Sequence, residues 1–521
     1  MNITAQGRYE ACESERETFL DRARDSSKLT LPTLIPPSNY SNATKYSTPF
    51  NSVGARGVNN LASKLLLSLV PPNAPFFRLK MDDFVIKEIE GDESLKTNIE
   101  EGLSQIERAI MTDIDVMSDR VAIFEALKHL IVAGNVLLFV GEDGIRVFPL
   151  SRYVVKRDPS GNVIEIVTKE SLSPNMLPEE IRPAVVDQLK GDEKSVDLFT
   201  YIHRKKDKFV VFQEVKGIVV PKSQGTFLAD KSPYIPLRFN RVDGESYGRG
   251  YVEEYYGDLK SLEGLTRAIV EGSAAASKVL FMVAPNGTTR ARKLGESPNG
   301  AIIEGSANDV SVLQVNKFND FRIAYDTMNR IETRLQLAFL LNSSIQRNAE
   351  RVTASEIRFM AEDLEQALGG IYSILSQEFQ LPYVMRKMAM MEKNKKLPKL
   401  PKDGVRPSIV TGLEALGRGN DKNKLIAFLQ TLAATLGQET IAKYINVTDA
   451  VSRLATSEGI DPKGLVRNEQ ELQAEMEAQM QAQQAQQLTQ AGIQVGAQKL
   501  GNIPSENITE SLSQLQEQIG Q

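Results

Sequence analysis

The segment that decides the fold runs from residue 251 to residue 278 and reads YVEEYYGDLKSLEGLTRAIVEGSAAASK. Its large apolar residues recur at steps of three and four, the spacing that places side chains on one face of a helix. Its second half, from Gly272 to Ser277, consists almost entirely of small residues. Because small side chains let helix backbones approach closely, we predict one long helix whose second half packs tightly against other helices.

A second amphipathic segment follows about 40 residues later. It predicts another long helix over residues 319–341, and its apolar positions are Phe321, Tyr325, Met328, Ile331, Leu335 and Phe339. The residues between the two helices are typical of strands separated by turns. The strands are predicted at Val279–Val283, Ala301–Glu304 and Val310–Val315. Two long helices are therefore expected to flank a compact β insertion.

The chain before residue 251 is predicted to be helical first and then rich in strands. A surface helix over the first 25 residues leads into a loop at residues 30–52, which is dense in Pro, Ser and Asn. Helices are predicted at Val53–Leu69, Ile99–Met117 and Arg120–Ala133, the last burying Val121, Phe124, Leu127, Leu130 and Ile131. Short β-branched and aromatic runs then predict an antiparallel β region over residues 135–242, with a helical insertion near 178–190.

The chain after residue 341 returns to helical patterns. Residues 342–352 are polar, and Thr353-Ala-Ser-Glu356 matches a capping box that opens a helix running to Phe379. Bends are expected at Gly369-Gly370 and at Pro382. Helical segments are also predicted over residues 422–456, and the tail beyond Asn468 is rich in Gln, Ala and Glu. The expected fold class is α+β, predominantly α.

Composition narrows the possible functions. The chain has 521 residues, and its 62 Lys+Arg against 67 Asp+Glu give a formal charge of −5. This length suggests three or four structural units. A single cysteine, Cys12, and two histidines, His129 and His203, leave few metal or acid–base groups. Without a signal peptide or an apolar run of membrane length, we expect a soluble intracellular protein that is not an enzyme and uses no metal or cofactor.

One catalytic motif does match. Gly244-Glu-Ser246-Tyr-Gly248 has the GxSxG pattern of a hydrolase nucleophile elbow, whose histidine follows the serine along the chain. No histidine follows His203, so a glycine-rich turn between the β region and the long helix is the favoured interpretation. His129 is expected to be a core residue of an apolar helix. His203, beside Arg204-Lys205-Lys206, is expected at a hairpin end, in a solvated turn.

Two basic segments are candidate contact surfaces. Residues 386–402 could meet a phosphate backbone, although an exposed helix end and linker is the favoured interpretation. At the tip of the β insertion, Arg290, Arg292 and Lys293 are expected to project from a loop. Docking of a partner or of nucleic acid there and a plain solvent-exposed turn are equally weighted alternatives.

Several stretches resemble one known family. They are GARGVNNLASKLLLSL (Gly54–Leu69), EALKHLIVAGNVLL (Glu125–Leu138), DGESYGRGYVEEYYGDLKSLEG (Asp243–Gly264), QRNAERVTASEIRFMAEDLEQALGGIYSILSQEFQL (Gln346–Leu381) and TGLEALGRG (Thr411–Gly419). Together, over about residues 25–425, they resemble the portal, or head-to-tail connector, proteins of short-tailed bacteriophages (podoviruses of the autographivirus type).

The resemblance implies a ring, usually of twelve subunits, at a unique vertex of the virion's capsid, assembled in the host cytoplasm. Double-stranded DNA would pass through its channel during packaging and ejection. The implied partners are the terminase large subunit, the tail adaptor, the major capsid protein, the scaffolding protein and internal core proteins, with no membrane. The implied parts are a wing (1–250), stem helices (251–278 and 319–341), a clip (279–318), a tunnel loop (342–353), a long wing helix with linker (354–404), a crown (405–467) and a C-terminal helical barrel (468–521).

The tunnel loop holds the residues that the resemblance places nearest to DNA. These are Arg347, Asn348, Glu350 and Arg351, which we expect to touch the sugar–phosphate backbone or to close the channel. The alternative is local pairing of either arginine with Glu350. A pI near 5.6 and the acids along the first stem helix suit a channel that repels DNA more than it holds it. Those acids are Glu253, Glu254, Asp258 and Glu263.

Two other classes of protein remain as alternatives. A serine hydrolase would need a reactive Ser246. A generic assembly scaffold would share the helices and the acidic tail but would have no channel. Nothing in the sequence resembles an ATP-binding motif, so the motor ATPase is expected to be another protein.

Overall fold

A computed structural model gives the fold for most of the chain. It describes residues 4–38, 45–72, 75–81, 93–189, 194–276, 280–313, 318–341, 364, 368–398, 405–409 and 417–436, together with 445, 447, 450, 451 and 454. The chain divides into two compact units, residues 1–415 and residues 416–521. In the second unit the main described element is helix α14, Gly417–Leu436, which confirms part of the predicted helical region. The Gln-rich tail lies outside the described residues.

Two antiparallel sheets form the strand-rich part of the first unit. In the larger sheet, β4 to β8 follow one another in order and β9 pairs with β7. The smaller sheet has the order β10-β2-β3. The antiparallel region predicted over residues 135–242 is therefore confirmed, with α6 (Arg182–Val186) as its helical insertion. The strands are β2 (Asn135–Gly141), β3 (Gly144–Pro149), β4 (Tyr153–Arg157), β5 (Val163–Leu172), β6 (Val196–Lys205), β7 (Lys208–Val215), β8 (Ile218–Val219), β9 (Gly225–Leu228) and β10 (Tyr234–Arg238).

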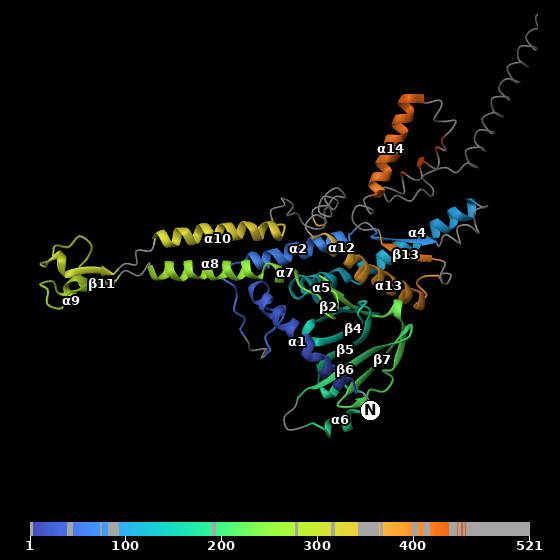
Figure 1. The fold of residues 1–521 in the computed structure, drawn as a ribbon, viewed down its shortest axis with the longest axis horizontal. Helices are drawn as coiled ribbons and strands as arrows, with labels where there is room; N and C mark the ends of the chain where they lie inside the picture. The colour runs from blue at the N-terminus through green and yellow to red at the C-terminus, as the bar shows by residue number, and fades with distance from the viewer. Residues whose placement is uncertain are drawn as a thin grey trace, which may run out of the picture. The chain divides into compact units, whose positions relative to one another are not determined.

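Helix α1, Ala5–Leu29, lies across the larger sheet (Figure 1). The prediction of a surface helix is wrong for one of its faces, because Tyr9 packs edge-on against Phe199 with ring centroids 5.5 Å apart. The first turn is also anchored, since the backbone amide of Ala5 donates to the carboxylate of Glu214 over 2.9 Å. The partial positive charge at a helix N-terminus stabilises a carboxylate in this position.

The main core draws buried residues from several helices and from strands of both sheets. The helices include α2 (Val53–Leu69), α4 (Glu93–Val116), α5 (Asp119–Ala133) and α13 (Leu381–Lys393). One part of the α5 prediction is wrong: Val121 is 71% exposed. The buried face of α5 contains Ile123, Leu127 and Leu130, and a rotation of about 100° per residue puts Val121 on the opposite side.

The end of α5 meets the turn that precedes the long helix. Gly134 has φ +73, and a Cβ atom built on it would lie 2.5 Å from the backbone nitrogen of Gly250. Next to it, the Asn135 side chain donates to the carbonyl of Gly248 over 2.8 Å and accepts from the amide of Gly248 over 2.7 Å. Two of the sequence stretches that carry the family resemblance are therefore joined by the Asn135 side chain and by close backbone packing at Gly134.

The two predicted long helices are confirmed. The first is α7 (Tyr251–Glu254) followed by α8 (Tyr256–Ala276), and the second is α10 (Phe318–Ala338). Helices α8 and α10 run side by side (Figure 1). The predicted close approach is confirmed at Gly272, where a Cβ atom would lie 2.6 Å from the ring of Phe321.

The insertion between these helices holds a two-stranded antiparallel sheet of β11 (Leu280–Val283) and β12 (Val310–Leu313). The predicted strand at Ala301–Glu304 is wrong, because these residues have no regular structure and Ile302 is fully exposed. Among the described residues, β11 and β12 pair only with each other, so residues 301–304 add no third strand to their sheet.

The helix preceding residue 393 is interrupted as predicted. Gly369 has φ +51 just before α12 (Gly370–Leu375), a π-helical turn spans Ser376–Gln380, and Pro382 lies in the first turn of α13. The capping box at 353–356 lies outside the described residues. Beyond α13, β13 (Val405–Ile409) pairs antiparallel with β1 (Phe77–Met81), a small sheet that the sequence did not predict.

Candidate functional site

Asp309 organises the insertion loop that carries the predicted docking residues. Its Oδ2 atom accepts hydrogen bonds from the amide of Thr288 at 2.7 Å, the hydroxyl of Thr288 at 2.9 Å and the amide of Thr289 at 3.0 Å. These bonds, led by the Thr289 amide, lower the pKa of Asp309. Gly287 permits the arrangement, because a Cβ atom there would lie 2.5 Å from Cγ of Asp309.

The docking residues lie on a short helix and not, as predicted, on a loop. Helix α9 spans Ala291–Glu296, so Arg292 and Lys293 are helical and Arg290 occupies the position before the first turn. Six residues are too few to produce a recognisable apolar period, which explains the error. Arg292 donates to Glu296 over 2.9 Å, and both side chains are exposed, so this ion pair contributes little to stability.

Large apolar side chains accompany this basic helix on the insertion. Phe281 is 64% exposed, Met282 is half exposed and Ile302 is fully exposed. Phe281 and Met282 are consecutive in β11, so their side chains point to opposite faces of the small sheet. Exposed apolar side chains of this size are typical of protein-binding regions.

The pair formed by α8 and α10 also exposes apolar side chains. They are Val270, Ile323, Tyr325 and Leu337, each about half exposed or more. Between the two helices, Arg334 donates to Asp258 over 2.6 Å.

The acids of the first long helix are largely engaged within the chain, contrary to the expectation of a free repelling surface. Glu253 pairs with Arg249 at 3.0 Å. Glu263 is 8% exposed and accepts the backbone amide of Phe50 over 2.9 Å. Together with the pair between Asp258 and Arg334, these contacts offset the charge that was expected to repel DNA.

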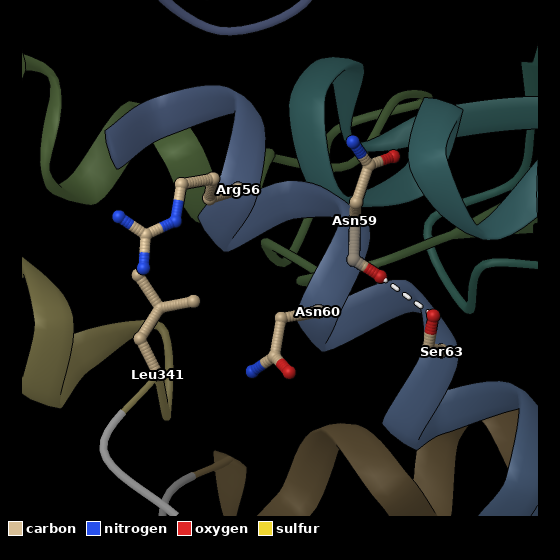
Figure 2. Close-up of a pocket in the computed structure, with 5 residues that line it drawn as sticks. All are labelled: Arg56, Asn59, Asn60, Ser63 and Leu341. Carbon is tan, nitrogen blue, oxygen red and sulfur yellow. Dashed lines mark hydrogen bonds between the residues drawn. The ribbon is translucent and has the colours of Figure 1, made fainter. Parts of the chain in front are cut away.

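A polar groove lies where α10 ends. It has a volume of about 280 Å³ and is lined by Arg56, Asn59, Asn60, Ser63 and Leu341. Four of these residues come from one side of α2, and Figure 2 shows the guanidinium of Arg56 beside Leu341. We call it the α2 groove. Sequence analysis missed it because nothing in the pattern of α2 indicates which segment its polar face meets.

Helix α2 also binds the end of α10 directly. The Asn60 amide donates to the carbonyls of Phe339 and Leu340, each over 3.0 Å, and Lys64 donates to the carbonyl of Leu340 over 3.2 Å. The ring of Phe339 packs against Gly57, where a Cβ atom would lie 2.5 Å from Cγ. The carbonyls of Phe339 and Leu340, which directly follow the last residue of α10, are thus bound by α2. The predicted tunnel-loop residues Arg347, Asn348, Glu350 and Arg351 follow this point and lie outside the described residues.

The histidines are placed differently. His129 is buried in α5 as predicted, and burial lowers its pKa to about 4, helped by Lys128. His203 lies near a hairpin end, as predicted, because β6 pairs with β7 and their turn follows Lys205. It is not in the turn itself: it lies in β6 and stacks on Tyr201 with ring centroids 5.0 Å apart. Burial lowers the pKa of His203 as well.

The GxSxG segment is the predicted turn. Ser246 is 8% exposed, and its carbonyl accepts a hydrogen bond from Arg157 over 3.2 Å. Gly244 adopts φ +77 within this turn. Among the described residues, no cluster of three or more His, Cys, Asp or Glu side chains is placed to hold a metal ion, and no helix has the length and apolarity to cross a membrane.

In the basic segment 386–402, the favoured interpretation of an exposed helix end is confirmed for residues 393–396 but is wrong for Lys387. Lys387 is 1% exposed, and its ammonium lies 2.6 Å from Oδ2 of Asp119 and 3.1 Å from Oδ2 of Asp113. Lys396 also pairs with Asp113, at 2.8 Å. Burial alone would raise the pKa of Asp113, but hydrogen bonds and charge from the two lysines outweigh burial and lower it. Lys387 therefore cannot meet a phosphate backbone.

Comparison with known proteins identifies the family. The family model described as "Bacteriophage head to tail connecting protein" matches residues 2–466. The chain belongs to this family. It is 43% identical over 480 residues to the portal protein of Escherichia phage T7, covering 90% of this chain and 89% of that protein. The portal protein of Enterobacteria phage T3 is 41% identical over 481 residues, with the same coverage. That of Enterobacteria phage SP6 is 30% identical over 430 residues, covering 82% of each chain.

Membership confirms the resemblance to portal proteins of short-tailed phages and makes the chain a component of the phage virion. Proteins of this family are structural connectors without catalytic activity, so the hydrolase interpretation of Ser246 is set aside. The fold is of the α+β class, as expected.

Proposed function

We propose that about twelve copies of this chain form a ring at a unique vertex of the capsid. Double-stranded DNA would pass through the ring during packaging and again during ejection. The observation that carries the proposal is the similarity to the T7 portal protein over nine tenths of the chain. The chain would contribute no chemistry of its own.

The exposed apolar side chains on α8 and α10 support the ring. Val270, Ile323 and Leu337 are about half exposed or more on a single copy. Burying such side chains is favourable by roughly 25 cal/mol per Å², and neighbouring copies in a ring would cover them.

Each part of the chain would have its own role in the ring. Residues 251–278 and 319–341 would form the stem, 279–318 the clip that docks the terminase large subunit and later the tail adaptor, and 342–353 a tunnel loop. The remaining parts would be a wing (1–250), a long wing helix with linker (354–404), a crown (405–467) and a C-terminal barrel (468–521). The wing and crown would meet the major capsid protein, the scaffolding protein and internal core proteins in the host cytoplasm.

Images of the purified protein viewed down its symmetry axis test the ring. We expect closed particles with a central hole wide enough for a DNA duplex. A strictly monomeric protein, or particles without a hole, would contradict the proposal and would favour the generic scaffold.

Reversing the charge of Arg290, Arg292 and Lys293 to glutamate should abolish binding of the terminase or the adaptor while rings still form. The reason is that an acidic partner surface would now be repelled. Pull-down of each partner on purified rings measures this effect. Glutamate at Arg204, Lys205 and Lys206, an exposed basic group elsewhere, is the matched control. Undiminished binding by the first variant would refute docking through these three residues.

Replacing Arg347 and Arg351 with alanine should reduce the DNA retained in filled heads, because each loss of charge is repeated around the ring. The measurement is DNA content per head after packaging and again after storage. If packaging and retention both match the wild type, neither arginine closes the channel, and local pairing with Glu350 becomes the better interpretation.

A further inference from the structure

The α2 groove combines an arginine with amide and hydroxyl groups, and none of the described residues that line it is acidic. Neither the guanidinium of Arg56 nor the side-chain amide of Asn59 has a hydrogen-bond or ion-pair partner among the described residues, and both residues are exposed. Groups of this kind supply most contacts from proteins to the phosphates of DNA.

The neighbouring polar groups of the groove already have hydrogen-bond partners, which leaves Arg56 and Asn59 as the groups available to a ligand. The Asn60 amide donates both of its hydrogen bonds to the end of α10, and the Ser63 hydroxyl donates to the carbonyl of Asn59 over 2.9 Å (Figure 2). Within the described part of the chain, Arg56 and Asn59 are left with unused donors, whereas the single donor of Ser63 is already used.

We infer that the α2 groove binds a phosphodiester group of the DNA that passes through the ring. This inference rests on the proposed function. Leu341 lines the groove, and the next residue begins the proposed tunnel loop, so the groove lies at the base of the segment expected to reach DNA. Its volume of about 280 Å³ is several times the roughly 30 Å³ occupied by one water molecule, which leaves room for a phosphate group.

With one arginine per copy, the groove would hold each phosphate group only weakly, as a channel for moving DNA requires. A charge-assisted hydrogen bond from a guanidinium to a phosphate is strong for a single bond. It is also easily exchanged for the next phosphate, because it is not reinforced by a second cation of the groove lining. The groove would therefore guide the DNA without holding one position.

Photo-crosslinking in filled heads tests the inference. We would place p-benzoylphenylalanine at Asn59 in the full-length chain, irradiate DNA-filled particles, and search for nucleotide adducts on the peptide that contains residue 59. The same probe at Ser63 is a second position in the groove. Val121, which is 71% exposed on α5, is the control position.

We expect DNA adducts at positions 59 and 63 and none at position 121. Arg56→Ala in the same ring should lower the adduct yield about tenfold, the effect of losing one charged hydrogen bond, whereas Arg108→Ala, an exposed arginine of α4, should leave it unchanged. Adducts only with protein, from the same chain or a neighbouring copy, would overturn the inference, as would a yield unaffected by Arg56→Ala. If wild-type rings fail to form or heads stay empty, the proposed function itself fails, which is a separate result.

Discussion

Replacing Lys387 with methionine should lower the free energy of unfolding by about 3–5 kcal/mol. The ammonium of Lys387 lies between the carboxylates of Asp113 and Asp119, and the hydroxyl of Tyr383 also donates to Asp119 over 2.6 Å. Methionine matches the shape of the lysine stem but leaves Asp119 buried without a cation. Urea unfolding at one fixed protein concentration, followed by circular dichroism, measures the change.

Lys393→Met is the matched control for this variant. Lys393 lies on the same helix and pairs with Glu142 at 3.0 Å, but its side chain is 75% exposed and that of Glu142 is 57% exposed. Exposed pairs contribute about 0–1 kcal/mol, so this variant should unfold nearly as the wild type does. If the two variants have the same free energy of unfolding, the buried ion pair contributes no more to stability than the exposed one.

The loss caused by Lys387→Met should also depend on pH. Lysine contacts lower the pKa of Asp113 in the folded protein, so its contribution to stability is present at neutral pH and is lost as the pH falls through that lowered value. The variant keeps only Lys396 beside Asp113. The difference in stability between variant and wild type should therefore hold from about pH 7 down to about pH 4, near the ordinary pKa of an aspartate, and shrink as the pH falls further. A difference that grows on acidification would contradict this account.

Gly134→Ala should destabilise the protein by about 2–5 kcal/mol. One cause is the left-handed backbone at φ +73, which costs an L-residue roughly 1–2 kcal/mol. The other is overpacking, because the new Cβ would lie 2.5 Å from the backbone nitrogen of Gly250. The backbone of this junction cannot move aside as a flexible side chain would. Thermal unfolding and the soluble yield of the variant give the readout.

Gly102→Ala provides the contrast within a helix. Gly102 lies inside α4, and a Cβ atom there would have no neighbour within 4 Å. Alanine is favoured over glycine in a helix interior by about 0.5–1 kcal/mol, so this variant should be slightly more stable than the wild type. A Gly134 variant that unfolds like the wild type would mean that the junction relaxes without cost.

Regular features of the fold were predictable because they leave a periodic trace. The apolar spacing of residues 251–278 and 321–339 predicted α8 and α10, and the run of small residues correctly indicated close approach at Gly272. Short β-branched and aromatic runs separated by turn residues predicted the antiparallel sheets. In each case the signal is local, so a window of a few residues contains it.

Features that depend on distant residues could not be predicted. Lys387 looked like one member of a solvated basic segment, and only the fold brings it to Asp113 and Asp119, more than 260 residues earlier. Strands β1 and β13 are five residues each and lie far apart in sequence, so neither has a local partner. Of the candidate sites, the basic insertion residues were identified but assigned to the wrong local structure. The α2 groove had no sequence signal, since it exists only where α10 ends on α2.

The attachment of α10 to α2 has a mechanical consequence. Side chains of α2 bond to the carbonyls of Phe339 and Leu340, and the ring of Phe339 is wedged against Gly57. A pulling force applied to the chain just beyond Leu341 would act on these hydrogen bonds before it could unwind the last turn of α10. The load would then pass through α2, whose Val58, Leu61 and Leu65 are fully buried, into the interior of the subunit. This joint would therefore direct a pulling force into the subunit core and away from the long helix.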